Sequence, residues 1–232
     1  MIKAVFFDLY QTLICYDPPR EEMQAEVLKE FGIQIEAAKL AHPIVSADEF
    51  FHQEHARQSI SKRSDQERIA LWGSYQQIVL TEAGIKPTEE LIGHVLKRMQ
   101  QIKFQQVLYD DVLPAITQLK EKGYIIGLIS NVDNDISQLL DKVGLSPLLE
   151  VVVTSIEAGY CKPQPEIFQA AAAKAGVKPE EAAYIGDQYR IDVMGAKEAG
   201  MLGILLDRGG YFDDQIKEPR VSSLAELDGH LS

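Results

Sequence analysis

The chain has 232 residues, 46% of them hydrophobic, which is enough for one buried core and a smaller second unit. Its formal net charge of -12 argues against a nucleic-acid partner, which would require a basic surface. We expect no secretory leader and no membrane partner, because no apolar stretch approaches the ~20 residues of a membrane span. The two cysteines, Cys15 and Cys161, are too few for a disulfide framework and favour a reducing, cytoplasmic location.

The N-terminal part of the chain predicts one strand followed by a helical unit. Residues 2–9 form an apolar run that is typical of a buried strand. Residues 16–104 have no convincing strand pattern and favour helices, over 20–31, 46–57, 64–83 and 88–103. Ser64 and Glu67 fit a capping box at the start of the third of these helices. A stripe of Leu71, Trp72, Tyr75 and Ile78 on that helix predicts core packing.

From residue 105 onward, short apolar runs alternate with helical segments. The runs predict strands at 124–129, 149–154, 182–185 and 202–206. A glycine closes each of the helical segments between them, at 112–122, 135–143, 165–175 and 192–199. This alternation predicts an α/β fold, a Rossmann-like parallel sheet flanked by helices. The core would comprise residues 1–15 and 105–232, with the helical unit of residues 16–104 inserted after the first strand, and a short helix is expected near residues 224–227.

Side chains suited to catalysis follow four of these predicted strands. They are Asp8 after the first strand, Ser130 and Asn131 after the second, Lys162 after the third, and Asp187 with Asp192 after the fourth. Because ligands bind outside the carboxyl ends of the strands in an open parallel sheet, we expect these side chains to converge on one pocket.

The converging groups indicate covalent hydrolytic chemistry. Carboxylates held together repel one another, and a hard cation such as Mg²⁺ relieves that repulsion. A lysine beside a nucleophilic aspartate keeps it ionised and attracts an anionic group. Hydroxyl and amide groups can donate to phosphoryl or carboxylate oxygens. We therefore expect Asp8 to attack the substrate, and water to hydrolyse the resulting ester or acyl phosphate.

These residues, in this order, resemble the four signature motifs of the haloacid dehalogenase-like hydrolases. The first motif, Asp-x-Asp-x-Thr in the family, is DLYQT at residues 8–12. The others are matched by Ser130, by Lys162 with Pro163, and by the pair Gly186–Asp187 with Asp192. The resemblance covers nearly the whole chain and is strongest to the subfamily that inserts a small helical cap after the first motif. It implies that residues 16–104 are a cap domain, hinged near residues 15–16 and 105–109.

The resemblance also implies a role for each candidate residue. Asp8 would be the nucleophile, Thr12 would orient the nucleophile loop, and Lys162 would take part in catalysis. Ser130, Asn131 and Tyr10 would bind substrate. Mg²⁺ would be held by Asp8, Asp187, Asp192 and the backbone carbonyl of Tyr10. Asp192 has the alternative roles of capping the following helix or orienting Lys162.

Two positions point to different reactions. Tyr10 stands where phosphatases of the family place a second aspartate as general acid, and tyrosine, with an ordinary pKa of ~10, is a poor substitute. The family's 2-haloacid dehalogenases carry an aromatic residue there, because a leaving halide needs no proton. Those dehalogenases need no metal, however, and have serine where this chain has Asp187. A further buried carboxylate is costly without a cation beside it.

We therefore favour a Mg²⁺-dependent phosphatase acting on a small phosphorylated metabolite. The first alternative is a metal-independent 2-haloacid dehalogenase. The second is a weakly active or non-catalytic protein that has kept the fold. The partner in the first two cases is a small molecule, a phosphoester or a 2-haloacid, and the sequence predicts no oligomeric state.

Overall fold

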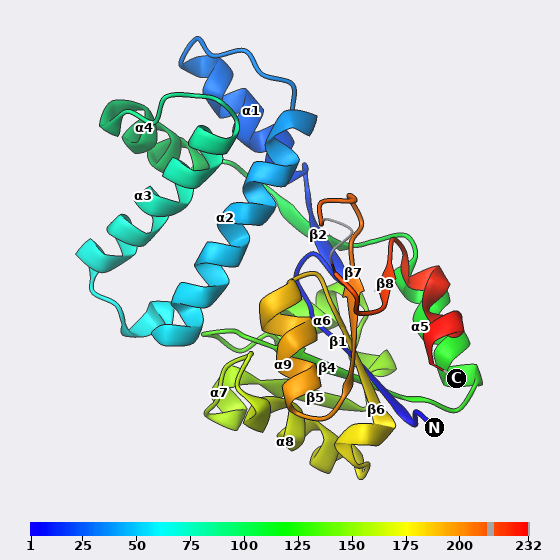
Figure 1. The fold of residues 1–232 in the computed structure, drawn as a ribbon. Helices are drawn as coiled ribbons and strands as arrows, with labels where there is room; N and C mark the ends of the chain where they lie inside the picture. The colour runs from blue at the N-terminus through cyan, green and yellow to red at the C-terminus, as the bar shows by residue number, and fades with distance from the viewer. Residues whose placement is uncertain (213–215, 232) are drawn as a thin grey trace. The chain divides into compact units, whose positions relative to one another are not determined.

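The computed structural model describes residues 1–212 and 216–231. The chain divides into two compact units (Figure 1), one formed by Met1–Cys15 with Val107–Ser232 and the other by Tyr16–Gln106. Among the described residues, no helix combines the length and the apolar character that crossing a membrane requires.

A six-stranded sheet forms the centre of the first unit. Its strand order is β5-β4-β1-β6-β7-β8, and each neighbouring pair is parallel. The strands are β1 (Ala4–Phe7), β4 (Ile125–Ser130), β5 (Val151–Thr154), β6 (Ala182–Gly186), β7 (Leu202–Leu206) and β8 (Arg220–Val221). The predicted α/β class is thereby confirmed. The edge strand β8 was not predicted, because two residues are too few to show an apolar pattern.

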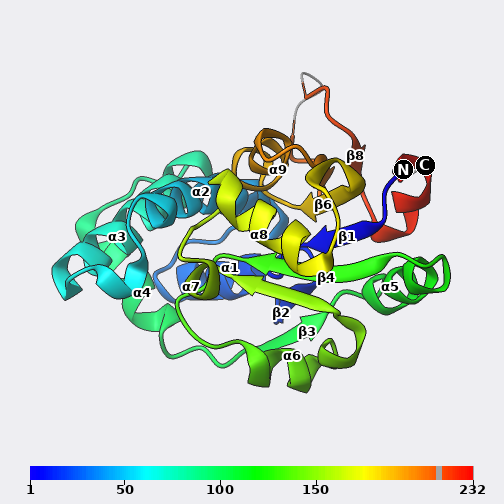
Figure 2. The same ribbon diagram turned by 90° about the horizontal axis from the view of Figure 1, so that it is seen from below.

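Both faces of this sheet are buried, which explains the continuous apolar runs of its strands. Along β1, Ala4 and Phe6 belong to one apolar cluster, whereas Val5 and Phe7 belong to another. This is the two-residue alternation of a strand. Helices α8 (Pro165–Ala175) and α9 (Gly195–Glu198) pack on the first face, and α5 (Val112–Glu121), α6 (Ser137–Val143) and η5 (Leu224–His230) on the second (Figure 2). The short helical turns η2 (Ser146–Leu148), α7 (Ser155–Ala158) and η3 (Pro179–Glu181) complete the connections.

The second unit consists of helices around its own apolar core. They are α1 (Arg20–Glu30), α2 (Ala38–Arg57), η1 (Ile60–Lys62), α3 (Asp65–Glu82) and α4 (Glu89–Met99). The capping box predicted at Ser64 and Glu67 is confirmed. Helix α2 begins at Ala38 rather than at Ser46, because burial of Leu40 and Ile44 stabilises the helix across the unfavourable Pro43.

A polar cluster is enclosed within the helical unit. Arg20 donates two hydrogen bonds to Asp48, at 2.9 and 2.7 Å, and the Tyr75 hydroxyl donates a third at 2.9 Å. The predicted packing of Tyr75 is thus confirmed, although its hydroxyl also has a polar role. Trp72 was expected in the core but is 38% exposed and stacks on Phe51, which is only partly buried.

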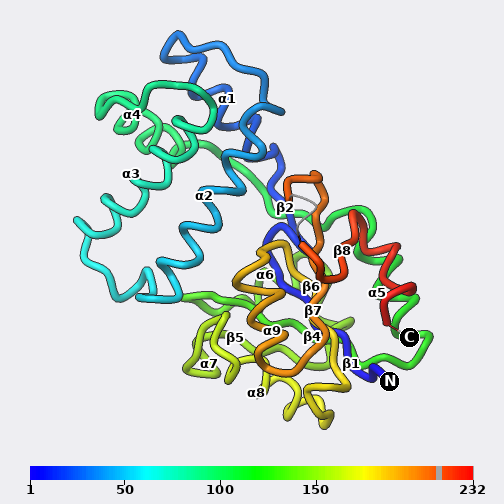
Figure 3. Tube along the Cα trace, in the orientation of Figure 1, coloured from blue at the N-terminus to red at the C-terminus, as the bar shows by residue number. Residues whose placement is uncertain are grey.

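Two strands connect the units. β2 (Ile14–Asp17) leads out of the first unit and β3 (Gln105–Leu108) leads back to it. They pair with each other in a two-stranded sheet, so the two crossings run side by side (Figure 3). The two ends of the helical insertion are therefore tied together where they enter the core.

Candidate active site

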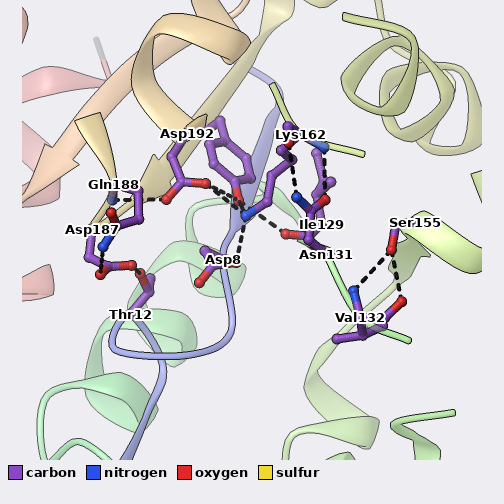
Figure 4. A network of polar contacts seen from close by, with 11 residues as sticks. Asp8, Thr12, Ile129, Asn131, Val132, Ser155, Lys162, Asp187, Gln188 and Asp192 are labelled. Carbon is purple, nitrogen blue, oxygen red and sulfur yellow. Dashed lines mark hydrogen bonds and ion pairs between the residues drawn. The ribbon is translucent and has the colours of Figure 1, made fainter. Parts of the chain in front are cut away.

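The centre of the sheet brings the predicted site residues together. β1 lies between β4 and β6, and the chain leaves each of these strands at its carboxyl end through Asp8, Ser130 and Asp187 respectively. Figure 4 shows the side chains of Asp8 and Asp192 converging on Lys162, which comes from the loop after α7. The predicted convergence thus follows directly from the parallel topology.

Lys162 lies at the centre of the site, and we call it and its partners Asp8, Asp192 and Tyr184 the hub. Its Nζ donates to Asp8 Oδ1 at 2.6 Å, to Asp192 Oδ1 at 2.7 Å and to the Tyr184 hydroxyl at 2.7 Å. An ammonium group has three donors, so all of them have partners. The side chains of Lys162 and Asp192 are 4% and 1% exposed. Water therefore competes little with these contacts, and the arrangement is held firmly.

The pKa values within the hub follow from burial and charge. Burial raises the pKa of Asp8 to about 6, although the charge of Lys162 acts in the opposite direction. Burial alone would lower the pKa of Lys162, but Asp192 and Asp8 raise it above its ordinary value, so the lysine stays charged. Burial, reinforced by the charge of Asp192, raises the pKa of Tyr184 well above its usual range, so its hydroxyl remains protonated.

Asp192 sits on a π-helix, η4 (Tyr189–Met194), rather than in the first turn of the predicted α-helix. The carbonyl of Gln188 accepts hydrogen bonds from Asp192 N at 2.8 Å and from Val193 N at 3.4 Å, which marks the wider turn. The Asp192 carboxylate turns back to accept from the Gln188 backbone amide at 3.0 Å as well as from Lys162. Asp192 thus both caps this turn and orients the lysine.

Gly186 leaves room for this inward carboxylate. A Cβ atom at position 186 would lie 2.2 Å from Asp192 Oδ2 and 2.4 Å from its Cγ. We expect Gly186→Ala to push Asp192 away from Lys162 and to lower the free energy of unfolding by about 1–3 kcal/mol. Urea unfolding measures this effect, with Gly93→Ala in α4 as the control, because its new methyl group meets no atom within 4 Å. Equal stability of the two variants would contradict the prediction.

Three carboxylates lie close enough to share a cation. Asp8, Asp187 and Asp192 each offer an oxygen within 4.8 Å of the others. Lys162 is bonded to two of them and supplies a single positive charge. The fully ionised cluster therefore keeps an excess of negative charge, which a divalent cation with oxygen ligands would neutralise. The oxygen ligands and the negative charge of these three carboxylates therefore fit Mg²⁺.

Thr12 and Asn131 support the site through hydrogen bonds to its other residues. The buried Thr12 hydroxyl donates to Asp187 Oδ1 at 3.5 Å, while Gln188 Nε2 donates to Asp187 Oδ2 at 2.8 Å. The Asn131 side chain donates to the Lys162 carbonyl at 2.9 Å and accepts from the Lys162 amide at 2.7 Å. Asn131 therefore positions the lysine loop, and its side-chain amide is already engaged.

Ser130 and Tyr10 occupy different surroundings. Ser130 is 1% exposed at the end of β4, beside the strand that leads to Asp8. Tyr10 is half-buried in the loop after β1 and packs against the apolar cluster on the α5 face. Burial of this ring in an apolar environment provides a physical reason for an aromatic residue at position 10.

Sequence reasoning missed Tyr184, a buried part of the hub. Its hydroxyl accepts from Lys162 and donates to the Ile129 carbonyl at 3.0 Å. A signal was present, because a tyrosine inside an otherwise apolar strand must find a partner for its hydroxyl. Sequence reasoning also missed Ser155. Its hydroxyl accepts from the amide of Val132, which follows β4, and donates to the carbonyl of the same residue.

Comparison with known proteins identifies the family. The model of the haloacid dehalogenase-like hydrolases matches residues 2–200. The chain belongs to this family. A relative from Methanopyrus kandleri, a glyceraldehyde 3-phosphate phosphatase, is 32% identical over 229 residues, which cover 95% of this chain and 89% of that protein. The predicted membership of this family is thereby confirmed, and the chain is a hydrolase.

Solved structures of two reaction types share the fold. A HAD phosphatase from Thermococcus onnurineus has a TM-score of 0.58 and 24% identity, covering 100% of this chain and 98% of that one. A 2-haloacid dehalogenase from Pseudomonas syringae has a TM-score of 0.55 and 25% identity, covering 99% and 97%. The fold alone therefore does not separate phosphate from halide chemistry, and the choice depends on the site.

Proposed function

We propose that this haloacid dehalogenase-like hydrolase is a Mg²⁺-dependent phosphatase acting on a small phosphorylated metabolite. The observation that carries the proposal is the third carboxylate, Asp187, within 4.8 Å of Asp8 and Asp192 around a single lysine. A metal-independent displacement of halide would give no reason to gather this much negative charge. The 32% identity to a glyceraldehyde 3-phosphate phosphatase supports the same choice.

The nucleophile and its supports have defined roles in this proposal. Lys162 holds Oδ1 of Asp8, so the other carboxylate oxygen is the one that attacks phosphorus. The bond to the leaving oxygen breaks as the new O–P bond forms, giving an aspartyl phosphate, and the leaving alkoxide takes a proton from solvent to become the alcohol. Water then attacks the phosphorus, releases inorganic phosphate and restores Asp8. The Ser130 hydroxyl and the Asn131 backbone amide donate to the phosphoryl oxygens.

Mg²⁺ would be held by the carboxylates of Asp8 and Asp187 with the Tyr10 carbonyl, and Asp192 would contribute its charge through Lys162. When bound, the cation neutralises charge on the phosphoryl group and on the carboxylates. Tyr10 is a weak acid for the leaving oxygen, with an ordinary pKa of ~10. We therefore infer that phosphoesters with good leaving groups are hydrolysed fastest.

A panel of substrates tests the proposal. With Mg²⁺, the protein should release phosphate from 4-nitrophenyl phosphate, and excess EDTA should lower the rate at least about 10²-fold. Asp187→Asn should have a similar effect. Asp141→Asn on α6, whose carboxylate is exposed and bonds Ser146, is the matched control and should retain the wild-type rate. Phosphate release that is unchanged by EDTA would contradict the metal assignment.

The second candidate is the 2-haloacid dehalogenase. It is favoured by Tyr10, because displacement of halide needs no general acid at that position. In the same panel it predicts chloride release from 2-chloropropionate without added metal. Chloride release under those conditions, together with no phosphate release from any ester, would replace the phosphatase proposal.

The proposal also assigns a role to the helical unit and a cellular location to the protein. We propose that residues 16–104 serve as a cap domain for the core of residues 1–15 and 105–232, and that they select the substrate. Insertion of this unit directly after the nucleophile loop supports that role. Cys15 and Cys161 are not joined in a disulfide, which is compatible with the cytoplasmic location expected from the sequence.

A further inference from the structure

We infer that Arg208 is a positioning residue for the nucleophile loop of residues 8–12, an inference that rests on the proposed phosphatase function. Arg208 follows β7, two strands away from β1 in the sheet. Its Nη2 donates to the backbone carbonyl of Thr12 at 2.9 Å. The contact reaches the loop through its main chain, so it depends on no side chain that the chemistry uses.

The guanidinium group is itself anchored. Nη1 and Nη2 of Arg208 donate to the two carboxylate oxygens of Asp111, both at 2.9 Å. Asp111 also accepts from the Ser223 hydroxyl at 2.7 Å and from the Leu224 amide at 2.9 Å. The Arg208 and Asp111 side chains are 19% and 18% exposed. A two-point arginine–carboxylate pair in partly buried surroundings holds the donor to Thr12 in a defined orientation.

Tyr109 contacts both Arg208 and the nucleophile loop. The Arg208 guanidinium lies 3.9 Å from the centre of the Tyr109 ring. The Tyr109 hydroxyl donates to Gln11 Oε1 at 3.1 Å, and the Tyr109 amide donates to the Leu13 carbonyl at 3.1 Å. The end of the loop and the residue after it, positions 11 to 13, are therefore held by Arg208 and the tyrosine stacked on it.

The backbone of the loop requires such restraint. Gln11 has φ of +60° and is the one residue other than glycine with positive φ in the part of the chain that the structure describes. A residue with a side chain is strained in this left-handed conformation. Such conformations persist where the surroundings impose them. Backbone hydrogen bonds close the turn itself, and the bonds from Tyr109 to Gln11 and from Arg208 to Thr12 restrain it from outside.

The restrained loop controls two groups of the proposed reaction. Asp8 begins it, and Thr12 at its end donates to Asp187, so a displaced loop would move the nucleophile relative to the metal-binding carboxylate. A shift of about 1 Å between reacting groups can lower a rate ~10²-fold. Arg208 would therefore affect turnover without touching substrate, cation or the reacting atoms.

Three variants test the inference. Arg208→Gln removes the guanidinium group, and Arg208→Lys keeps the positive charge without the planar two-point geometry. Ser223→Ala is the matched control. The Ser223 variant loses a hydrogen bond to the same Asp111 carboxylate but no contact with the loop. With 4-nitrophenyl phosphate, Arg208→Gln should lower kcat about 10- to 100-fold with KM changed less than about 3-fold. Arg208→Lys should restore little of this loss, and Ser223→Ala should keep the wild-type kcat.

Hydrogen–deuterium exchange provides a readout that does not require activity. The Gln11 amide donates to the Ile14 carbonyl, and the amides of Leu13 and Ile14 donate to the Leu9 carbonyl. In Arg208→Gln, a peptide covering residues 8–16 should exchange faster than in the wild type, and in Ser223→Ala it should not. Should Arg208→Gln fail to fold, Tyr109→Phe, which removes the hydroxyl that donates to Gln11, should give the same direction of change.

The outcomes separate this inference from the proposed function. If the wild type hydrolyses no phosphoester, the phosphatase proposal fails, while exchange in the loop still decides the role of Arg208. Unchanged loop exchange in the Arg208 variants would overturn the inference. So would an equal loss of kcat in Ser223→Ala, because the effect would then belong to the Asp111 anchor in general.

Discussion

Replacing Asp8 by asparagine is expected to lower kcat for 4-nitrophenyl phosphate at least about 10⁴-fold. The amide cannot form the aspartyl phosphate, whereas its oxygen can still accept the hydrogen bond that Lys162 now donates to Oδ1. The fold should be retained, since the change removes one of three mutually repelling carboxylates around one ammonium. Phosphate release under saturating substrate and Mg²⁺ measures the effect.

The control for this variant is again Asp141→Asn, which makes the same chemical change at an exposed position of α6. Urea unfolding without Mg²⁺ should show Asp8→Asn to be at least as stable as the wild type. Turnover by Asp8→Asn above about one hundredth of the wild-type rate would show that the nucleophile lies elsewhere. A large loss of stability would instead assign Asp8 a structural role.

Lys162→Met is expected to affect both turnover and stability. Methionine has a similar length but leaves Asp8 and Asp192 buried without their shared partner. Removing one member of a buried ion cluster costs about 3–5 kcal/mol, because the remaining charges are uncompensated. We expect a fall of this size in the free energy of unfolding at pH 7 without metal. We also expect a loss of kcat of at least about 10³-fold, because Asp8 loses the donor that orients it.

Lys174→Met provides the matched control on the same core unit. Lys174 pairs with Glu157 at 2.7 Å, but the two side chains are 44% and 55% exposed. Exposed pairs of this kind contribute about 0–1 kcal/mol. In urea unfolding, the loss in free energy of unfolding should therefore be several-fold larger for Lys162→Met than for Lys174→Met. If the free energy of unfolding of Lys162→Met lies within about 1 kcal/mol of the wild-type value, the hub does not stabilise the core as expected.

All strands of the six-stranded sheet except β8, their order along the chain and the residues that follow them could be predicted from local signals. Continuous apolar runs indicate strands buried on both faces, and the β–α alternation indicates parallel pairing. Parallel pairing then places Asp8, Ser130 and Asp187 at one edge of the sheet whatever the finer details. The candidate site was therefore accessible from the sequence, because it follows from topology.

Helix boundaries were predicted less well where packing opposes local preference. Ser46 is a typical residue for a helix start, yet α2 extends back to Ala38 through Pro43. The apolar surface that this extension buries decides the outcome, and it belongs to neighbouring helices that the local pattern does not contain. The π-helix around Asp192 was not predicted either, and its carboxylate accepts hydrogen bonds from Lys162, which lies on another segment, and from the Gln188 amide.

The sequence by itself determined the fold class, the motif residues and the conflict between Tyr10 and Asp187, because each depends on residue type and order along the chain. Only the tertiary structure decided which side chains act together. Arg208 and Thr12 are 196 positions apart, and Tyr184 meets Lys162 from another strand. Their hydrogen bonds depend on distances of about 3 Å between separate elements. No local pattern contains that information, and packing of the whole core supplies it.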